Sequence, residues 1–183
     1  MVTIEALLVA AGATVDDPQM TGRRLGQIQT EMQALRELVG GHGDDAGAQV
    51  VDVATTVHHL VDRLSVDYTG SVGVVARAAA PAQVARTALH RILGNLLHNA
   101  MRAAGADGCV LVTVVPGLRE VSLLVEDDGP GLGALPVVHG VGLHSVRRLV
   151  HQVGGRLESI PRGPLGGASI RVNLPAAGRE MAS

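Results

Sequence analysis

The chain has 183 residues, of which 46% are hydrophobic, and its formal net charge is -2. This length fits one full domain with a short additional segment, and the near-neutral charge argues against nucleic acid as the main partner. One cysteine, Cys109, excludes an intrachain disulfide framework, and no apolar run approaches the roughly 20 residues that span a bilayer. The first residues also lack the basic start of a signal peptide. We therefore predict a cytoplasmic protein without a membrane segment.

The N-terminal part of the chain has the pattern of two short helices. Apolar spacing predicts a helix over residues 3–13, which ends before Pro18 because proline disfavours helix in the residue that precedes it. Apolar residues recur at three- and four-residue steps over 22–39 and predict a second helix. Residues 1–40 are interpreted as a helical hairpin too small to bury itself, which pairs with a partner. A glycine-rich linker is predicted over residues 41–48.

Residues 49–177 are predicted to form a domain in which helices and strands mix, followed by a tail over 178–183. Apolar patterns predict helices over 50–64, 81–104 and 141–153. Pro81 is placed in the first turn of the long helix, where its missing N–H costs least. Strands are predicted over 72–77, 110–115, 120–125, 156–160 and 168–174. These elements predict an α/β fold, a two-layer sandwich with a mixed sheet covered by three helices.

Three polar residues share one face of the long helix. Asn95 and Asn99 are four residues apart, and Arg102 follows three residues later. Two amide oxygens beside one guanidinium suit a Mg²⁺-triphosphate, because the oxygens bind a hard cation and arginine contacts a phosphate oxygen. A solvated helix edge would account for the same residues.

Two glycine motifs follow along the chain. Asp127-x-Gly129-x-Gly131 comes directly after an apolar strand, where a carboxylate can accept a hydrogen bond from an exocyclic amine of a base. Gly140-x-Gly142 opens the helix that follows, and the free N–H groups of a helix start favour phosphate. An ordinary acidic turn and simple helix capping are the alternative interpretations of these two motifs.

Residues from about 50 to 175 resemble the ATP-binding domain of sensor histidine kinases, within the GHKL ATPase superfamily and its Bergerat fold. Asn95–Ala100 is similar to the N box of that family, Asp127–Leu132 to the G1 box and Gly140–Leu143 to the G2 box. Gly166–Ile170 and Asn173–Pro175 resemble the last box and the final strand. The order and spacing of these motifs agree over roughly two-thirds of the chain.

The resemblance implies a role for each matching residue. Asn99, helped by Asn95, would hold Mg²⁺, and Arg102 would contact phosphate. Asp127 would read the adenine of ATP. The pocket would be shaped by Gly129, Gly131, Gly140, Gly142 and Leu143.

The sequence also departs from its relatives. The ATP-hydrolysing members carry a glutamate general base where this chain has Asn95, and an amide cannot take a proton from water, so phosphotransfer is favoured over hydrolysis. The chain has no Phe, which removes the aromatic box of the lid, and only residues 132–139 separate the two glycine motifs. Ala103 stands where the family often has an aromatic residue or a His. Ala168 stands where the last family box commonly has a Thr.

A phosphoacceptor histidine is missing from the expected place. In the family it is followed by Glu or Asp on the first helix of the dimerisation hairpin, and each of the eight histidines here precedes a non-acidic residue. Residues 1–40 resemble a partial dimerisation hairpin that starts just beyond this position. A natural split kinase and a truncated form of a longer one are both compatible with this pattern.

Together these features predict the ATP-binding catalytic subunit of a two-component histidine kinase, with ATP and Mg²⁺ as cofactors. Its phosphoacceptor would be a histidine on a separate phosphotransfer or kinase protein, with a response regulator downstream and a possible homodimer through the N-terminal helices. A non-catalytic ATP-sensing module is one alternative, favoured by the short lid. A GHKL serine kinase of the anti-sigma type is the other, although such kinases usually lack an N-terminal hairpin.

Overall fold

The computed structural model describes residues 47–132 and 141–178. The predicted hairpin of residues 1–40 and the tail beyond residue 178 lie outside the described residues, as do most of the linker and of the segment 132–139. The described residues belong to the second of two compact units, Asp44–Ser183.

The main sheet has five strands in the order β2-β4-β5-β7-β6. β2 runs parallel to β4, and the other neighbours are antiparallel, so the sheet is mixed as predicted. β4 and β5 form the expected hairpin through residues 116–119. The strands are β2 (Ser71–Ala76), β4 (Cys109–Val115), β5 (Glu120–Asp127), β6 (Arg156–Ile160) and β7 (Ser169–Pro175).

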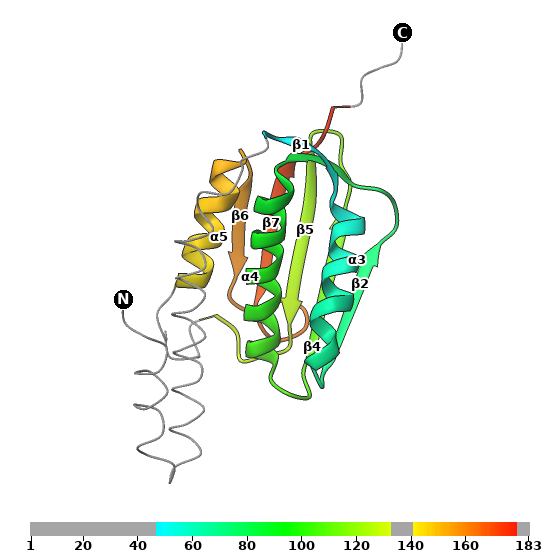
Figure 1. Cartoon of the computed structure of the whole chain (residues 1–183). Helices are drawn as coiled ribbons and strands as arrows, with labels where there is room; N and C mark the ends of the chain where they lie inside the picture. Colours follow the sequence, from blue (N-terminus) through cyan, green and yellow to red (C-terminus); the bar gives the residue numbers. More distant parts are fainter. Residues whose placement is uncertain (1–46, 133–140, 179–183) are drawn as a thin grey trace, which may run out of the picture. The chain divides into compact units, whose positions relative to one another are not determined.

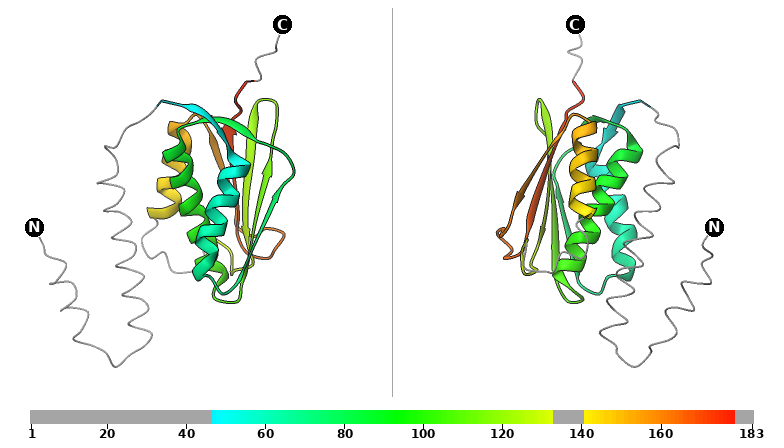
Figure 2. Two further views of the ribbon diagram at one scale, coloured as in Figure 1. Left: turned by 45° about the vertical axis from the view of Figure 1, so that its right-hand side comes forward. Right: turned by 90° about the vertical axis from the view of Figure 1, so that its left-hand side faces the viewer.

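Three α-helices cover one face of this sheet. They are α3 (Val53–Leu64), α4 (Arg86–Ala104) and α5 (Val141–Gln152), and a short 3-10 turn, η2 (Ser65–Asp67), follows α3. Figure 1 shows the helices in front of the strands, and Figure 2 shows the two layers from the side. This confirms the predicted two-layer α/β sandwich.

The start of the predicted helix over 50–64 is wrong. Residues Gln49–Asp52 form strand β1, and α3 begins only at Val53. The helix starts there because the Asp52 carboxylate caps it, accepting the N–H of Ala54 at 3.3 Å. Val51 is buried and pairs with Ala82, 31 residues later in the chain, a partner that the local pattern does not reveal.

The start of the predicted helix over 81–104 is also wrong. Pro81–Val84 is strand β3, which pairs antiparallel with β1 in a second, two-stranded sheet that the sequence analysis did not predict. Proline is tolerated as the first residue of a strand, and the Pro81 carbonyl accepts the N–H of Ala177 at 2.9 Å. α4 begins five residues later, after Ala85, which has an extended backbone and no side-chain cap.

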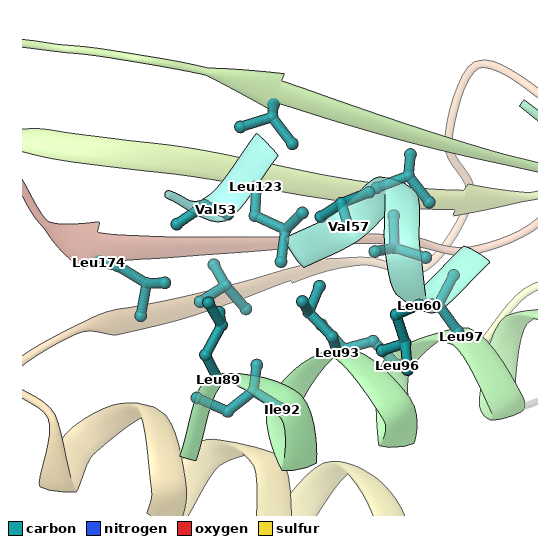
Figure 3. Close-up of a cluster of buried hydrophobic side chains, with 14 of the residues drawn as sticks. Val53, Val57, Leu60, Leu89, Ile92, Leu93, Leu96, Leu97, Leu123 and Leu174 are labelled. Carbon is teal, nitrogen blue, oxygen red and sulfur yellow. The ribbon is translucent and has the colours of Figure 1, made fainter. Parts of the chain in front are cut away.

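The core lies between the helices and the sheet and is aliphatic throughout. Every second residue of β4 and β5 faces the helices, including the buried Val112 and Leu123. Figure 3 shows α3 and α4 contributing to the same cluster, which includes Val57, Leu93 and Leu97. Because this packing needs branched aliphatic side chains from several elements, it holds α4 at a set position on the sheet.

Candidate functional site

Asp127 is the last residue of β5 and is held firmly by the backbone around it. Its side chain is buried, and Oδ1 accepts the N–H groups of Gly129 at 3.0 Å and Ala168 at 3.1 Å. The Asp127 N–H donates to the Ala168 carbonyl at 3.0 Å, and its carbonyl accepts the N–H of Gly167 at 3.0 Å. Both side-chain bonds use Oδ1, so Oδ2 is the oxygen that we consider for a ligand.

The environment of Asp127 stabilises the protonated form of its carboxyl group more than water would. Burial raises the pKa of Asp127 above its usual value, the hydrogen bonds from Ala168 and Gly129 lower it, and the nearby Asp128 raises it again. The net direction is upward. Asp128 itself turns to β4, where its Oδ1 accepts the Cys109 N–H at 2.9 Å.

Alternation along β5 separates Asp127 from its acidic neighbour. Glu126 pairs with Leu111 and Ser169, whereas Asp127 pairs with Val110, whose side chain is in the core layer. Successive side chains of a strand point to opposite faces, so Glu126 lies on the side of the sheet away from the helices. Asp127 is therefore the carboxylate on the helix side.

The glycine motif after β5 packs tightly against neighbouring backbone. A Cβ at Gly129 would lie 2.5 Å from the Ala103 carbonyl oxygen, so only glycine lets this turn approach the end of α4. Gly131 has φ +87, and a Cβ there would lie 2.6 Å from the Pro161 carbonyl oxygen. That same carbonyl accepts the N–H of Leu132 at 3.0 Å. The motif is thus joined to α4 on one side and to the β6–β7 loop on the other.

Two of the three polar residues of α4 are in contact. The Arg102 Nη2 donates to the Asn99 Oδ1 at 3.4 Å, which places the guanidinium beside that amide. Asn95 is buried, Asn99 is half-buried and Arg102 is exposed. Asn99 and Arg102 therefore face outward at the end of α4 that the Gly129 turn contacts.

The second glycine motif is only partly within the described residues. Gly140 lies outside them, and Gly142 belongs to the first turn of α5, which begins at Val141 as the sequence analysis predicts. Leu143 is half-buried and packs against the core. α5 lies next to α4 (Figure 1), so the start of α5 is placed on the same side of the sheet as Asn99.

Two backbone positions of this site, Gly167 and Ala168, were not predicted from the sequence. They lie at the end of the β6–β7 loop, where the Gly167 N–H donates to the Asp127 carbonyl and the Ala168 N–H to its Oδ1. A Cβ at Gly167 would overlap the Asp127 side chain and the Gly129 N–H. The run Gly166-Gly167-Ala168 was visible as a match to the last family box, but its contact with Asp127 depends on the pairing of β5 with β7.

Comparison with known proteins agrees with this geometry. The profile of the family described as histidine kinase-, DNA gyrase B-, and HSP90-like ATPase matches residues 84–178. The chain belongs to this family. The matched residues of this chain include helix α4, the turn after Asp127 and the β6–β7 loop.

Curated relatives carry the names of sensor kinases. The chain is 28% identical over 174 residues to the sensor histidine kinase GtrS of Pseudomonas aeruginosa, covering 87% of this chain and 36% of that protein. It is 39% identical over 107 residues to the sensor protein kinase CarS of the same species, covering 49% of this chain and 23% of that protein. The chain thus spans about a third or less of the length of these relatives.

Solved structures of histidine kinase domains share the fold. The ATP-binding domain of PrrB from Mycobacterium tuberculosis aligns with a TM-score of 0.64 and 20% identity, covering 74% of this chain and all of that one, 100%. The mycobacterial sensor histidine kinase MprB aligns with a TM-score of 0.60 and 22% identity, covering 72% of this chain and 99% of that one.

Among the helices that the structure describes, none is long and apolar enough to cross a bilayer.

Proposed function

We propose that this chain is the ATP-binding catalytic subunit of a two-component histidine kinase. The observation that carries the proposal is the Asp127 carboxylate, buried at the end of β5 with Oδ1 held by two backbone N–H groups. Its Oδ2 would accept a hydrogen bond from the exocyclic amine of adenine. A rigid acceptor of this kind discriminates between bases because a partner without the amine would leave a buried charge unpaired.

The glycine residues of the site would bring backbone close to the nucleotide. Gly129 and Gly131 position the turn beside Asp127. The N–H groups at the start of α5, around Gly140 and Gly142, would bind phosphate oxygens, since a helix start carries unpaired donors and a partial positive charge. Leu143 would close the apolar side of this pocket.

The donor set on α4 fits a magnesium ion held together with phosphate. Asn99 presents a neutral amide oxygen, Asn95 lies one turn earlier, and Arg102 lies beside Asn99. Mg²⁺ is usually held by few protein oxygens plus substrate phosphates and waters. The described residues hold no cluster of three or more His, Cys, Asp or Glu side chains that would form a metal site of its own. When bound, the ion neutralises charge on the phosphates.

The chain's own residues favour transfer to an external nucleophile. An imidazole nitrogen of a histidine on a separate protein would attack the γ-phosphorus in line, forming an N–P bond while the bond to the leaving ADP oxygen breaks. Asn95 stands where a hydrolase needs a base, and an amide cannot accept a proton from water. Arg102 would stabilise the charge of the transferred group.

The wider setting is part of the same proposal. The names of GtrS and CarS support a place in sensor kinase signalling, with a response regulator downstream. Residues 1–40 would form a helical hairpin that pairs with the same hairpin of a second copy of the chain. The protein would be located in the cytoplasm. A non-catalytic nucleotide-binding module is the second candidate, favoured by the short interval of residues 132–139 between the two glycine motifs.

Two measurements test the proposal. Calorimetry should detect ATP binding by the native chain, with Asn99→Ala removing the Mg²⁺ dependence. Incubation with labelled ATP and a purified histidine phosphotransfer protein should then yield an acid-labile phosphoprotein. ATP binding without transfer would support the non-catalytic module, and acid-stable labelling of a partner would support a serine kinase. Absence of nucleotide binding would contradict all three.

A further inference from the structure

The solvent side of the helical layer is strongly basic. Its helices carry six arginines, namely Arg63, Arg86, Arg91, Arg102, Arg147 and Arg148. They also carry six histidines, His58, His59, His90, His98, His144 and His151. Asp62 is the single acidic residue of the three helices. We call the exposed and half-buried basic side chains of α3, α4 and α5 the cationic helix face.

This charge is not neutralised within the described part of the domain. The ion pairs found there, Arg156 with Glu120 at 3.3 Å and Arg171 with Glu158 at 3.8 Å, both lie on the sheet. On the helices, burial and the positive charges of Arg63 and Arg86 lower the pKa of His90. Arg63 and Arg86 thus act on His90 as positive charges that form no ion pair among the described residues.

Binding of ATP accounts for only part of the cationic helix face. Arg102 lies beside Asn99, but Arg91 precedes Asn99 by eight residues and Arg86 by thirteen. At the rise of 1.5 Å per residue, these two positions are about 12 Å and about 20 Å farther along α4. A triphosphate held at Asn99 does not reach Arg86, so the positive charge extends well beyond the nucleotide site.

The chemistry of the face selects among polyanions. The exposed large hydrophobic residues of the described chain lie outside α3, α4 and α5, so the described side chains of these helices include no exposed large apolar group for insertion into a lipid surface. The near-neutral net charge of -2 and the lack of Phe and Trp argue against nucleic acid as the partner of this face. Arginine pairs well with carboxylates in a bidentate geometry. A polar, carboxylate-bearing surface is the complement that remains.

We propose that the cationic helix face docks a separate protein through a carboxylate-rich surface. The step goes beyond phosphotransfer, because it concerns residues outside the nucleotide site. Complementary charge of this kind mainly speeds association and sets orientation. Arg86 and Arg148 sit on different helices, so the docking surface would extend across the layer seen in Figure 1.

The test uses the full chain and a fluorescent poly-glutamate peptide as the probe, followed by anisotropy in about 0.1 M salt, where screening acts over about 10 Å. Arg86→Glu with Arg148→Glu should weaken binding by about tenfold or more. The matched control is Arg77→Glu with Arg119→Glu, which makes the same charge change at exposed positions outside the helices and should have an effect of less than about threefold. Arg86→Gln with Arg148→Gln should give an intermediate loss.

Several results would overturn the proposal. Equal losses in the two charge-reversal pairs would mean that only net charge matters, and no binding by the native chain would remove the surface altogether. Tighter binding to anionic vesicles or to a single-stranded oligonucleotide than to the peptide would assign the face to another class of partner. Circular dichroism and ATP calorimetry on each variant separate loss of folding or of the nucleotide site from loss of docking.

Discussion

At the scale of single residues, Asp127 has to be buried and still keep an oxygen that can accept a hydrogen bond from a ligand. A buried carboxylate is costly unless it is hydrogen-bonded, and this one is satisfied by two N–H groups while keeping one oxygen for a ligand. Its upward pKa shift comes from the burial that also makes it selective. The neutral acid form would lose the acceptor that the adenine amine needs, so acidification should act directly on nucleotide binding.

Replacing Asp127 by Asn should therefore weaken ATP binding by roughly tenfold to a hundredfold, the usual worth of a hydrogen bond to a charged group. In the native chain, affinity should fall as the pH is lowered toward the raised pKa, because the carboxylate gains its proton earlier than a free Asp would. Calorimetry over a pH series measures both effects. The Asp127→Asn variant should lack this pH dependence, and an identical pH profile in both proteins would contradict the assignment.

Gly129 and Gly94 form a second contrast at this scale. A Cβ at Gly129 meets the Ala103 carbonyl oxygen, whereas a Cβ at Gly94, in the middle of α4, meets nothing within 4 Å. Gly129→Ala should lower the free energy of unfolding by about 1–3 kcal/mol and weaken ATP binding, since the turn must move away from α4. Chemical denaturation and calorimetry measure the two effects.

The control at Gly94 should move the other way. Alanine is the better helix former by about 1 kcal/mol, so Gly94→Ala should stabilise the chain and leave ATP binding unchanged. Equal destabilisation by both substitutions would show that the Gly129 turn does not depend on close approach to α4.

At the scale of elements, Asp52 explains how one segment changes from strand to helix. Its carboxylate accepts the N–H groups of Ala54 at 3.3 Å and Ala80 at 2.7 Å, and the Thr55 hydroxyl also donates to it. The residue therefore caps α3 and ties it to the segment before β3. Burial raises the pKa of Asp52, but these hydrogen bonds outweigh it, and the net shift is downward.

Asp52→Ala should lower the free energy of unfolding by about 1–2 kcal/mol, the typical cost of a lost cap. Because the folded-state pKa is lowered, this contribution is present above the ordinary pKa of Asp and is lost as the pH falls through the folded value. Chemical denaturation should show that the free energies of unfolding of the native chain and of Asp52→Ala differ less in acid than at pH 7. Asp62→Ala, at an exposed site on the same helix, should change stability by less than about 0.5 kcal/mol.

Local sequence patterns predicted which helices and strands exist more accurately than they predicted where each one begins and ends. The helices over α3, α4 and α5 and the five strands of the main sheet were predicted, because apolar periodicity differs between helix and strand. β1 and β3 were not, since each is short and they pair with each other, and Ala82 of β3 also bridges to Ala176 just after β7. A proline that begins a helix and one that begins an edge strand have the same local appearance.

At the scale of the whole molecule, stability rests on an aliphatic core without Phe or Trp. Leu93 of α4 is fully buried in that core, whereas Leu118 in the β4–β5 turn is 97% exposed. Leu93→Ala should lower the free energy of unfolding by about 2–5 kcal/mol through lost burial and the cavity it leaves. Leu118→Ala should change it by less than about 0.5 kcal/mol. Chemical denaturation of both variants measures the contrast, and similar losses would contradict the position of the core.

The sequence by itself determined the family, the α/β class and the order of the site motifs, because short motifs such as Asn95–Asn99 and Asp127–Gly131 need only local spacing to be recognised. It did not reveal that Ala168 donates to the Asp127 carboxylate and Gly167 to the Asp127 carbonyl, or that Ala103 limits residue 129 to glycine. Those contacts join segments up to 41 residues apart. Only strand register and helix packing bring such segments together, so only the tertiary structure decided them.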